Sequence, residues 1–328
     1  MSSAKLRLAL LADVHGNLPA LEAVITELER VQPDYVVVDG DLINAVPFSA
    51  GVIDRVRSLG WLVVRGNHEF YYLNFGTERG ASDGEDPARW GQLHWLVEHL
   101  SAEQGHYLAM LPDERTLYLP GTQPVRIAHG VPGRNRVGFY HDQPAQAVVA
   151  EIEGIAERTV ISAHTHVQID RHLRVELDPP ADPFANPHVD GRAGRDNATH
   201  RHWHLVNPGS VGLPLSGEPS AQFAVLESVP EAEMPGGWRA THLRVPYDRR
   251  PALAAYAESG MEAAGGVISQ LFYWELVTAE PEIILFYRWA RRHGHDPDAD
   301  IAAAFHAYRS ESARERYVRQ RDPLYSIR

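Results

Sequence analysis

Five short apolar runs in the sequence each end directly on residues that can hold a metal ion or contact a phosphate. The polar clusters that follow them read Asp-Val-His-Gly-Asn, Asp-Gly-Asp, Arg-Gly-Asn-His-Glu, His-Gly and His-Thr-His. Runs of this length are typical of strands buried on both faces. Because ligands of open α/β sheets bind beyond the carboxyl ends of the strands, five such endings predict one shared site. The runs span residues 6–12, 35–38, 61–64, 125–128 and 159–163.

The segments between the first three runs favour an α/β fold. Leu21, Val24, Ile25 and Leu28 recur at helical spacing after the first run, and residues 48–59 predict a second helix. The order strand, helix, strand, helix, strand predicts right-handed crossovers and a parallel sheet.

The rest of the chain divides into two parts. Residues 178–201 are rich in Pro, Asp, Gly, Arg and Asn, and predict a long loop, either a surface insertion or a substrate lid. We expect a catalytic domain over residues 1–247 and a helical segment over residues 248–328, which either packs on that domain or forms a homo-oligomer interface. Strands are predicted at 116–119, 167–177, 202–206 and 222–226, and helices at 87–110, 145–156, 252–264, 283–292 and 301–319.

The side chains at the strand ends have the chemistry of a transition-metal site. The chain has no cysteine and 18 histidines, so imidazole nitrogen and carboxylate or amide oxygen must supply the ligands. This set suits Mn, Fe, Zn or Ni better than Mg or Ca. In extended chain, residues i and i+2 point to the same side, so Asp13 and His15 can face one ion, as can His164 and His166. Seven ligands would serve two ions roughly 3.5–4 Å apart. The candidate ligands are Asp13, His15, Asp41, Asn67, His129, His164 and His166.

The order of these motifs resembles the calcineurin-like metallophosphoesterase superfamily. The resemblance covers residues from about 6 to about 247, and residues 207–212 (NPGSVG) resemble a late loop of its small prokaryotic phosphodiesterase branch. It implies a four-layer α/β/β/α sandwich of two mixed sheets, here with a C-terminal helical appendage. It also implies a binuclear metal centre and in-line attack on phosphorus by a metal-activated water.

The resemblance assigns a role to each residue. Asp13, His15 and His166 would hold the first ion, and Asn67, His129 and His164 the second, with Asp41 bridging the two. His68 would sit over the phosphate as a general acid or transition-state stabiliser. Asn67, Arg134 and Arg136 are candidate substrate contacts, although exposed arginines on a loop are the simpler interpretation of the last two.

The residues after the Gly-Asp motif differ from those of one branch of the superfamily. Protein Ser/Thr phosphatases continue the Gly-Asp motif into Asp-Arg-Gly, whereas this chain continues as Leu42-Ile43-Asn44-Ala45. The phosphate-binding arginine of those enzymes is therefore missing, and Asn44 stands where an aspartate would orient the catalytic histidine. This argues against a phosphoprotein or dinucleoside polyphosphate phosphatase.

Other polar residues have simpler interpretations. Asp39 is expected to cap a loop or support the site rather than bind an ion, and Glu69 to cap the helix that follows it. His200, His202 and His204 alternate along one run, which favours an exposed strand face over a further metal site.

These features predict a cytoplasmic, metal-dependent phosphoric ester hydrolase that acts on a small phosphorylated substrate, with a phosphodiester favoured over a phosphomonoester. A nuclease, a phosphatase and a non-catalytic metal-binding scaffold are the alternatives. The net charge of −12 argues against nucleic acid as the partner. The first apolar run is too short for a membrane span.

Overall fold

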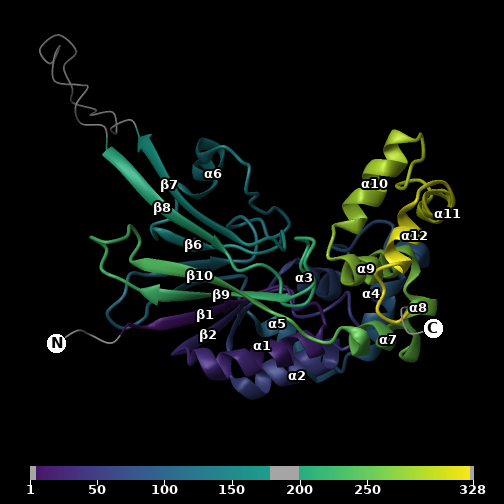
Figure 1. Ribbon diagram of the computed structural model, residues 1–328, viewed down its shortest axis with the longest axis horizontal. Helices are drawn as coiled ribbons and strands as arrows, with labels where there is room; N and C mark the ends of the chain where they lie inside the picture. Colours follow the sequence, from purple (N-terminus) through teal and green to yellow (C-terminus); the bar gives the residue numbers. More distant parts are fainter. Residues whose placement is uncertain (1–4, 178–198, 326–328) are drawn as a thin grey trace, which may run out of the picture.

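The computed structural model describes residues 5–177 and 199–325, and its strands form two five-stranded sheets (Figure 1). Both sheets contain parallel and antiparallel pairs. The strands are β1 Arg7–Leu11, β2 Tyr35–Asp39, β3 Leu62–Val64, β4 Glu114–Leu117, β5 Val125–Ala128, β6 Thr159–Ile161, β7 Ile169–Leu177, β8 Thr199–Asn207, β9 Ala221–Ser228 and β10 Trp238–Val245.

The helices lie on the outer faces of the sheets and at one end of the molecule. They are α1 Leu18–Val31, α2 Ser49–Leu59, α3 Asn67–Asn74, α4 Pro87–His99, α5 Ala102–Met110, α6 Ala145–Ile152, α7 Arg250–Glu258, α8 Met261–Ala264, α9 Gly266–Thr278, α10 Glu282–Arg292, α11 Ile301–Glu311 and α12 Arg314–Arg319.

The first sheet has the strand order β10-β9-β1-β2-β3. Its strands β1, β2 and β3 are parallel, with Leu10 opposite Val37 and Val38 opposite Val63. The connections that carry α1 and α2 make this pairing possible, because parallel strands need a crossover. The carboxyl ends of the three strands therefore meet at one edge, where the first three polar clusters begin.

The second sheet has the order β4-β5-β6-β8-β7. Strands β5, β6 and β8 are parallel, while β4 and β7 pair antiparallel at the two edges. The carboxyl ends of β5 and β6 lie side by side and bring His129 and His164 into the same region as the clusters of the first sheet.

The two sheets pack face to face through an apolar core. Leu10 of β1, Ile127 of β5 and Val206 of β8 belong to this core and are fully buried. Helices α1 and α2 cover the outer face of the first sheet, and α6 covers the second. The predicted four-layer α/β/β/α sandwich is confirmed.

The helices after residue 247 pack against one end of the sandwich. They share an apolar core with Trp95 of α4 and with Ala45 and Val46, which follow β2. The hydroxyl of Tyr256 on α7 donates a hydrogen bond to the carbonyl oxygen of Ala45 at 2.9 Å. The C-terminal helices thus contact the loop that carries Asp41.

The prediction of one helix over residues 87–110 was wrong. The chain leaves helical geometry at Leu100, and Ser101 starts α5 with a capping box. The Ser101 hydroxyl accepts a hydrogen bond from the Gln104 N–H at 3.2 Å, and the Gln104 side chain accepts one from the Ser101 N–H at 3.0 Å. This reciprocal pair stabilises a new helix start, which apolar periodicity alone does not reveal.

The sequence pattern also missed two elements for opposite reasons. Helix α9 is apolar on nearly every side, so it lacks the periodic stripe by which a half-buried helix is found. Strand β10 is an edge strand rich in polar residues. The predicted loop over 178–201 was too long at its end, because residues 199–201 begin β8. Residues 178–198 lie outside the described part of the chain.

Membrane-spanning helices were searched for in the same part of the chain. No helix within residues 5–177 and 199–325 is both long and apolar enough to cross a membrane.

A buried carboxyl in the C-terminal helices makes stability depend on pH. Burial raises the pKa of Glu275 on α9 to about 8, against a usual value of 4.5. Between these values the folded protein keeps a proton that the unfolded chain has lost, so the free energy of unfolding falls as pH rises and levels off above about pH 8. Glu275→Gln keeps an oxygen to accept the Ile283 N–H, which lies 3.2 Å from the Glu275 oxygen.

We therefore expect Glu275→Gln to be more stable than the wild type above about pH 8, by on the order of a few kcal/mol, and equal to it near pH 4.5. Thermal unfolding of both proteins across this range measures the difference. A constant difference at every pH would contradict the predicted titration of Glu275.

Candidate metal centre

The seven predicted ligands converge at the edge where the parallel strands of both sheets end. Asp13 and His15 follow β1, Asp41 follows β2, His129 follows β5, His164 and His166 follow β6, and Asn67 begins α3. All are buried except His164, which is half-buried. Residues separated by up to 153 positions along the chain thus share one interior site.

The backbone at these residues is unusual. Left-handed φ values of 52°, 51°, 52°, 67° and 57° occur at Asp13, His15, Asp41, His164 and His166 respectively. The prediction that Asp13-x-His15 and His164-x-His166 are extended was therefore wrong. A positive φ is costly for a residue with a side chain and is concentrated at functional sites. The surrounding structure holds these turns in place to bring the side chains together.

Four of the side chains form the first half of the site. The ligand atoms of Asp13, His15, Asp41 and His166 all lie within 4.8 Å of one another. The Nε2 atoms of His15 and His166 are 3.0 Å apart, and Nε2 of His166 is 3.6 Å from Oδ1 of Asp13. Such a spacing of nitrogen and oxygen atoms fits ligands arranged around a single ion.

The remaining three side chains form the second half. Oδ1 of Asn67 lies 3.0 Å from Nε2 of His129 and 2.8 Å from Nδ1 of His164. Asp41 belongs to both halves, because its Oδ2 is 3.2 Å from Nε2 of His129 and 3.7 Å from Nε2 of His15. The carboxylate of Asp41 therefore lies between the two groups.

Backbone carbonyls fix the orientation of two of the imidazole rings. Nδ1 of His129 lies 2.8 Å from the Asp39 oxygen, and Nδ1 of His166 lies 2.6 Å from the Leu213 oxygen. A carbonyl only accepts, so each Nδ1 carries a proton and the Nε2 atom of each ring faces the other side chains of the site. Metal-binding histidines commonly have this arrangement.

The electrostatics of the site favour cations. Both carboxylate oxygens of Asp13 are buried and have no hydrogen-bond partner among the described residues. Burial lowers the pKa of His164 to about 4 and of His166 to about 3, which keeps both rings in the neutral form that binds metals. Burial also lowers the pKa of His129, but the carboxylates of Asp41 and Asp13 outweigh this effect and raise it well above its usual value. These nitrogen and oxygen donors fit bound metal ions.

The NPGSVG loop supports the end of β1. The N–H groups of Val211 and Gly212 donate to the carbonyls of Ala12 and Asp13 at 2.9 and 3.0 Å, and the Ser210 hydroxyl donates to Asp13 at 2.8 Å. A Cβ atom on Gly212 would lie 1.9 Å from the Val14 oxygen, so only glycine fits there. Leu213, which directly follows the loop, supplies the carbonyl that orients His166, so the loop supports two of the ligand residues.

Glu69 ties the loop after β2 to the start of α3. Its carboxylate accepts hydrogen bonds from the N–H groups of Gly66, Asp41 and Leu42 at 2.7–2.9 Å. The predicted helix-capping role is confirmed. The two additional bonds hold Asp41 in its left-handed turn, a contribution that the sequence did not reveal.

His68 has a chain of amide partners. Nδ2 of Asn44 lies 2.9 Å from Nδ1 of His68, and Nε2 of Gln92 donates to Oδ1 of Asn44 at 2.6 Å. Asn44 therefore orients His68 in place of an aspartate. Gln92 was missed because it lies among the apolar residues of α4, and no local pattern links it to Asn44.

Aromatic rings surround His68. Its ring centroid lies 4.7 Å from that of His15, 5.4 Å from that of Tyr71 and 6.0 Å from that of Phe272. Tyr71 follows His68 by three positions on α3, so the two side chains lie on the same side of that helix. Phe272 comes from α9, which places the C-terminal helices beside the site.

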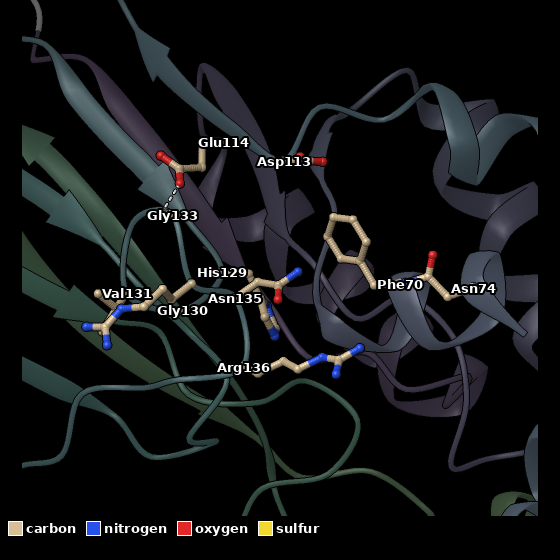
Figure 2. A pocket seen from close by; sticks show the side chains of 12 residues that line it. Phe70, Asn74, Asp113, Glu114, His129, Gly130, Val131, Gly133, Asn135 and Arg136 are labelled. Atoms are coloured by element: carbon tan, nitrogen blue, oxygen red, sulfur yellow. Dashed lines mark hydrogen bonds between the residues drawn. The ribbon is translucent and has the colours of Figure 1, made fainter. Parts of the chain in front are cut away.

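The two candidate substrate arginines differ in position. A cavity of about 320 Å³ opens beside His129 and is lined by the loop after β5 and by Phe70 and Asn74 of α3 (Figure 2). Arg134 pairs with Glu151 at the exposed rim. Arg136 lies with its guanidinium carbon 4.6 Å from the centroid of the Tyr71 ring and extends toward α3 in Figure 2. Of the two, only Arg136 contacts a residue that borders His68.

Comparison with known proteins agrees with this fold and these motifs. The calcineurin-like phosphoesterase family model matches residues 6–168. An uncharacterized protein of Methanocaldococcus jannaschii is 21% identical over 236 residues, which cover 68% of this chain and 83% of that protein.

Two solved structures share the fold. A metallophosphoesterase from Sphaerobacter thermophilus is 24% identical with a TM-score of 0.57, over 83% of this chain and 99% of that one. A hypothetical protein from Pyrococcus horikoshii OT3 is 20% identical with a TM-score of 0.60, over 82% of this chain and 98% of that one. Residues 6–168, which carry the strand-end motifs, match the calcineurin-like phosphoesterase family model, and this part of the chain belongs to that family.

Proposed function

We propose that this protein is a two-metal phosphodiesterase whose catalytic domain is residues 1–247. The position of Asp41 between two groups of buried nitrogen and oxygen ligands is the observation that carries the proposal. Asp13, His15 and His166 would hold one ion, Asn67, His129 and His164 the other, and Asp41 both. Bound there, the ions would neutralise phosphate charge and lower the pKa of water to about 7.

His68 would act as the proton donor to the leaving group. Burial lowers its pKa, so the ring is neutral near pH 7. The amide nitrogen of Asn44 can only donate, which makes Nδ1 of His68 the acceptor and leaves the proton of the neutral ring on Nε2. Gln92 keeps the Asn44 amide in that orientation. The ring therefore presents an N–H group without carrying a charge.

The preference for a diester follows from the charges around the site. A phosphomonoester dianion carries one more negative charge than a diester, and the arginine that follows the Gly-Asp motif in Ser/Thr phosphatases is absent here. Arg136 remains as a cation beside Tyr71. A singly charged diester needs no further positive group.

The central experiment measures hydrolysis of bis-p-nitrophenyl phosphate by the Mn-loaded protein, together with the metal content of the same sample. Turnover with about two ions per chain would support the proposal. The monoester p-nitrophenyl phosphate is the matched substrate, and a higher kcat/KM for it would overturn the diesterase assignment. A protein that binds no metal would overturn the site itself.

Arg136 is expected to bind the substrate, whereas Arg134 is not. Arg136→Ala removes a cation beside the site and should raise KM roughly ten-fold, the effect of one charge-assisted hydrogen bond, with a smaller change in kcat. Arg134→Ala is the matched control, because its partner Glu151 is at the exposed rim. Steady-state kinetics of both variants test this, and equal KM values would remove Arg136 from the substrate site.

A further inference from the structure

A second group of possible metal ligands lies on the hairpin of β7 and β8. Asp170 and His172 are two residues apart on β7 and so share a face of the sheet, and His204 of β8 lies directly opposite His172. The three offer ligand atoms within 4.8 Å of one another. The strand register thus creates a compact group that is separate from the seven residues of the first centre.

The burial of His204 differs from the sequence prediction. His204 was expected on an exposed strand face, but it is completely buried, because its face of β8 is turned toward the other sheet. The side chain of Asp170 is 40% exposed and that of His172 is 43% exposed. The group therefore combines one fixed interior histidine with two ligands that solvent can reach.

The contacts point the donor atoms at a common position. Nε2 of His204 is 2.7 Å from Oδ1 of Asp170, and Nε2 of His172 is 4.0 Å from the same oxygen. The rings of His172 and His204 stack with centroids 4.1 Å apart. Nδ1 of His204 has no hydrogen-bond partner among the described residues, so Asp170 holds this ring through Nε2. The exposed ring of His172 can rotate about its side-chain bonds.

The charge of the surroundings is compatible with one divalent ion. The Asp170 carboxylate faces His172 and His204 on the hairpin and His242 of β10 in the opposite sheet. The last of these uses its Nε2 to contact the Asn207 carbonyl oxygen at 2.8 Å. Among these neighbours the carboxylate is the one anion, and the imidazoles of His172 and His204 supply neutral donors when unprotonated.

We propose that Asp170, His172 and His204 form a further metal site, which takes a single zinc ion. Two imidazoles and one carboxylate are a common zinc ligand set, with water in the fourth position. The ion would bind Nε2 of His204 and Oδ1 of Asp170 in place of their hydrogen bond, with the ring proton of His204 on Nδ1, and so link the two strands of the hairpin. This site is independent of the proposed phosphodiesterase centre.

The test counts zinc by elemental analysis after equilibrium dialysis at low micromolar free zinc. The proteins are the wild type, His172→Ala, Asp170→Asn and, as a matched control, His106→Ala, whose side chain is exposed on α5. We expect His172→Ala to bind one ion fewer than the wild type and His106→Ala to bind the same number. Asp170→Asn keeps an oxygen to accept the His204 hydrogen bond but removes the charge, so it should also lose one ion.

The difference in bound zinc between the wild type and the variants, rather than the total zinc content, decides the outcome. Three ions in the wild type and two in His172→Ala support both centres. One ion in the wild type and none in His172→Ala support this site and contradict the proposed binuclear centre. Equal zinc content in the wild type, His172→Ala and Asp170→Asn overturns the site, whatever the total, and leaves a hydrogen-bonded His–Asp pair.

Discussion

Replacing Asp41 is expected to remove bound metal and activity together. Its carboxylate lies 3.7 Å from Nε2 of His15 on one side of the site and 3.2 Å from Nε2 of His129 on the other. Without it neither ion keeps a complete ligand set, and the His129 side chain loses the nearest carboxylate. We expect metal content to fall below one ion per chain and kcat/KM to fall about a thousand-fold or more, equivalent to several kcal/mol of transition-state stabilisation.

Asp41→Asn is a better variant than Asp41→Ala. The φ of 52° at this position is tolerated by Asn and Asp but strained for alanine, so Asn separates loss of charge from loss of the turn. Asp142→Asn, at an exposed position, is the matched control. Elemental analysis and diester kinetics on the same samples give both readouts. Unchanged metal content in Asp41→Asn would exclude Asp41 as the bridging ligand.

Replacing His68 should separate chemistry from metal binding. Its side chain contacts Asn44 and aromatic rings, and only its backbone N–H bonds to the Asp41 carboxylate, at 2.8 Å. His68→Ala keeps that N–H bond, so the ions should stay in place. Loss of a general acid costs typically a hundred-fold to ten-thousand-fold in turnover, and we expect kcat to fall within this range with metal content unchanged.

His106→Ala serves as the control for His68→Ala, because it removes an exposed imidazole from another helix. The acid role is tested further by substrates with leaving groups of different pKa. A good leaving group needs no protonation, so the effect of His68→Ala should shrink for p-nitrophenol esters and grow for alkyl esters. The same loss for both substrates would instead indicate stabilisation of the phosphate, and full activity would exclude either role.

Much of the site could be predicted because its residues follow recognisable strands. A short apolar run identifies a buried strand, and parallel strands end at one edge of a sheet. Asp41, Asn67 and His129 therefore share a site although their segments are distant in sequence, as the structure finds. The same logic fails for α9 and β10, because the one is apolar all round and the other mostly polar.

Some contacts at the site depend on tertiary packing and cannot be found from local sequence patterns. Nothing in the sequence distinguishes Arg134 from Arg136. In the structure Arg134 pairs with Glu151 at the exposed rim, whereas Arg136 packs against the Tyr71 ring beside the site. Gln92 supports Asn44 because α4 packs over the loop after β2.

The sequence by itself determined the family motifs, the five strands that end on candidate ligands and the chemistry of those ligands, since these depend on residue type and on spacing within short segments. Only the tertiary structure decided the left-handed turns at the ligands, the amide partners of His68 and the burial of His204. The physical reason is that each of these depends on contacts between segments far apart in the chain. A side chain's partners are fixed only when the sheets and helices are packed together.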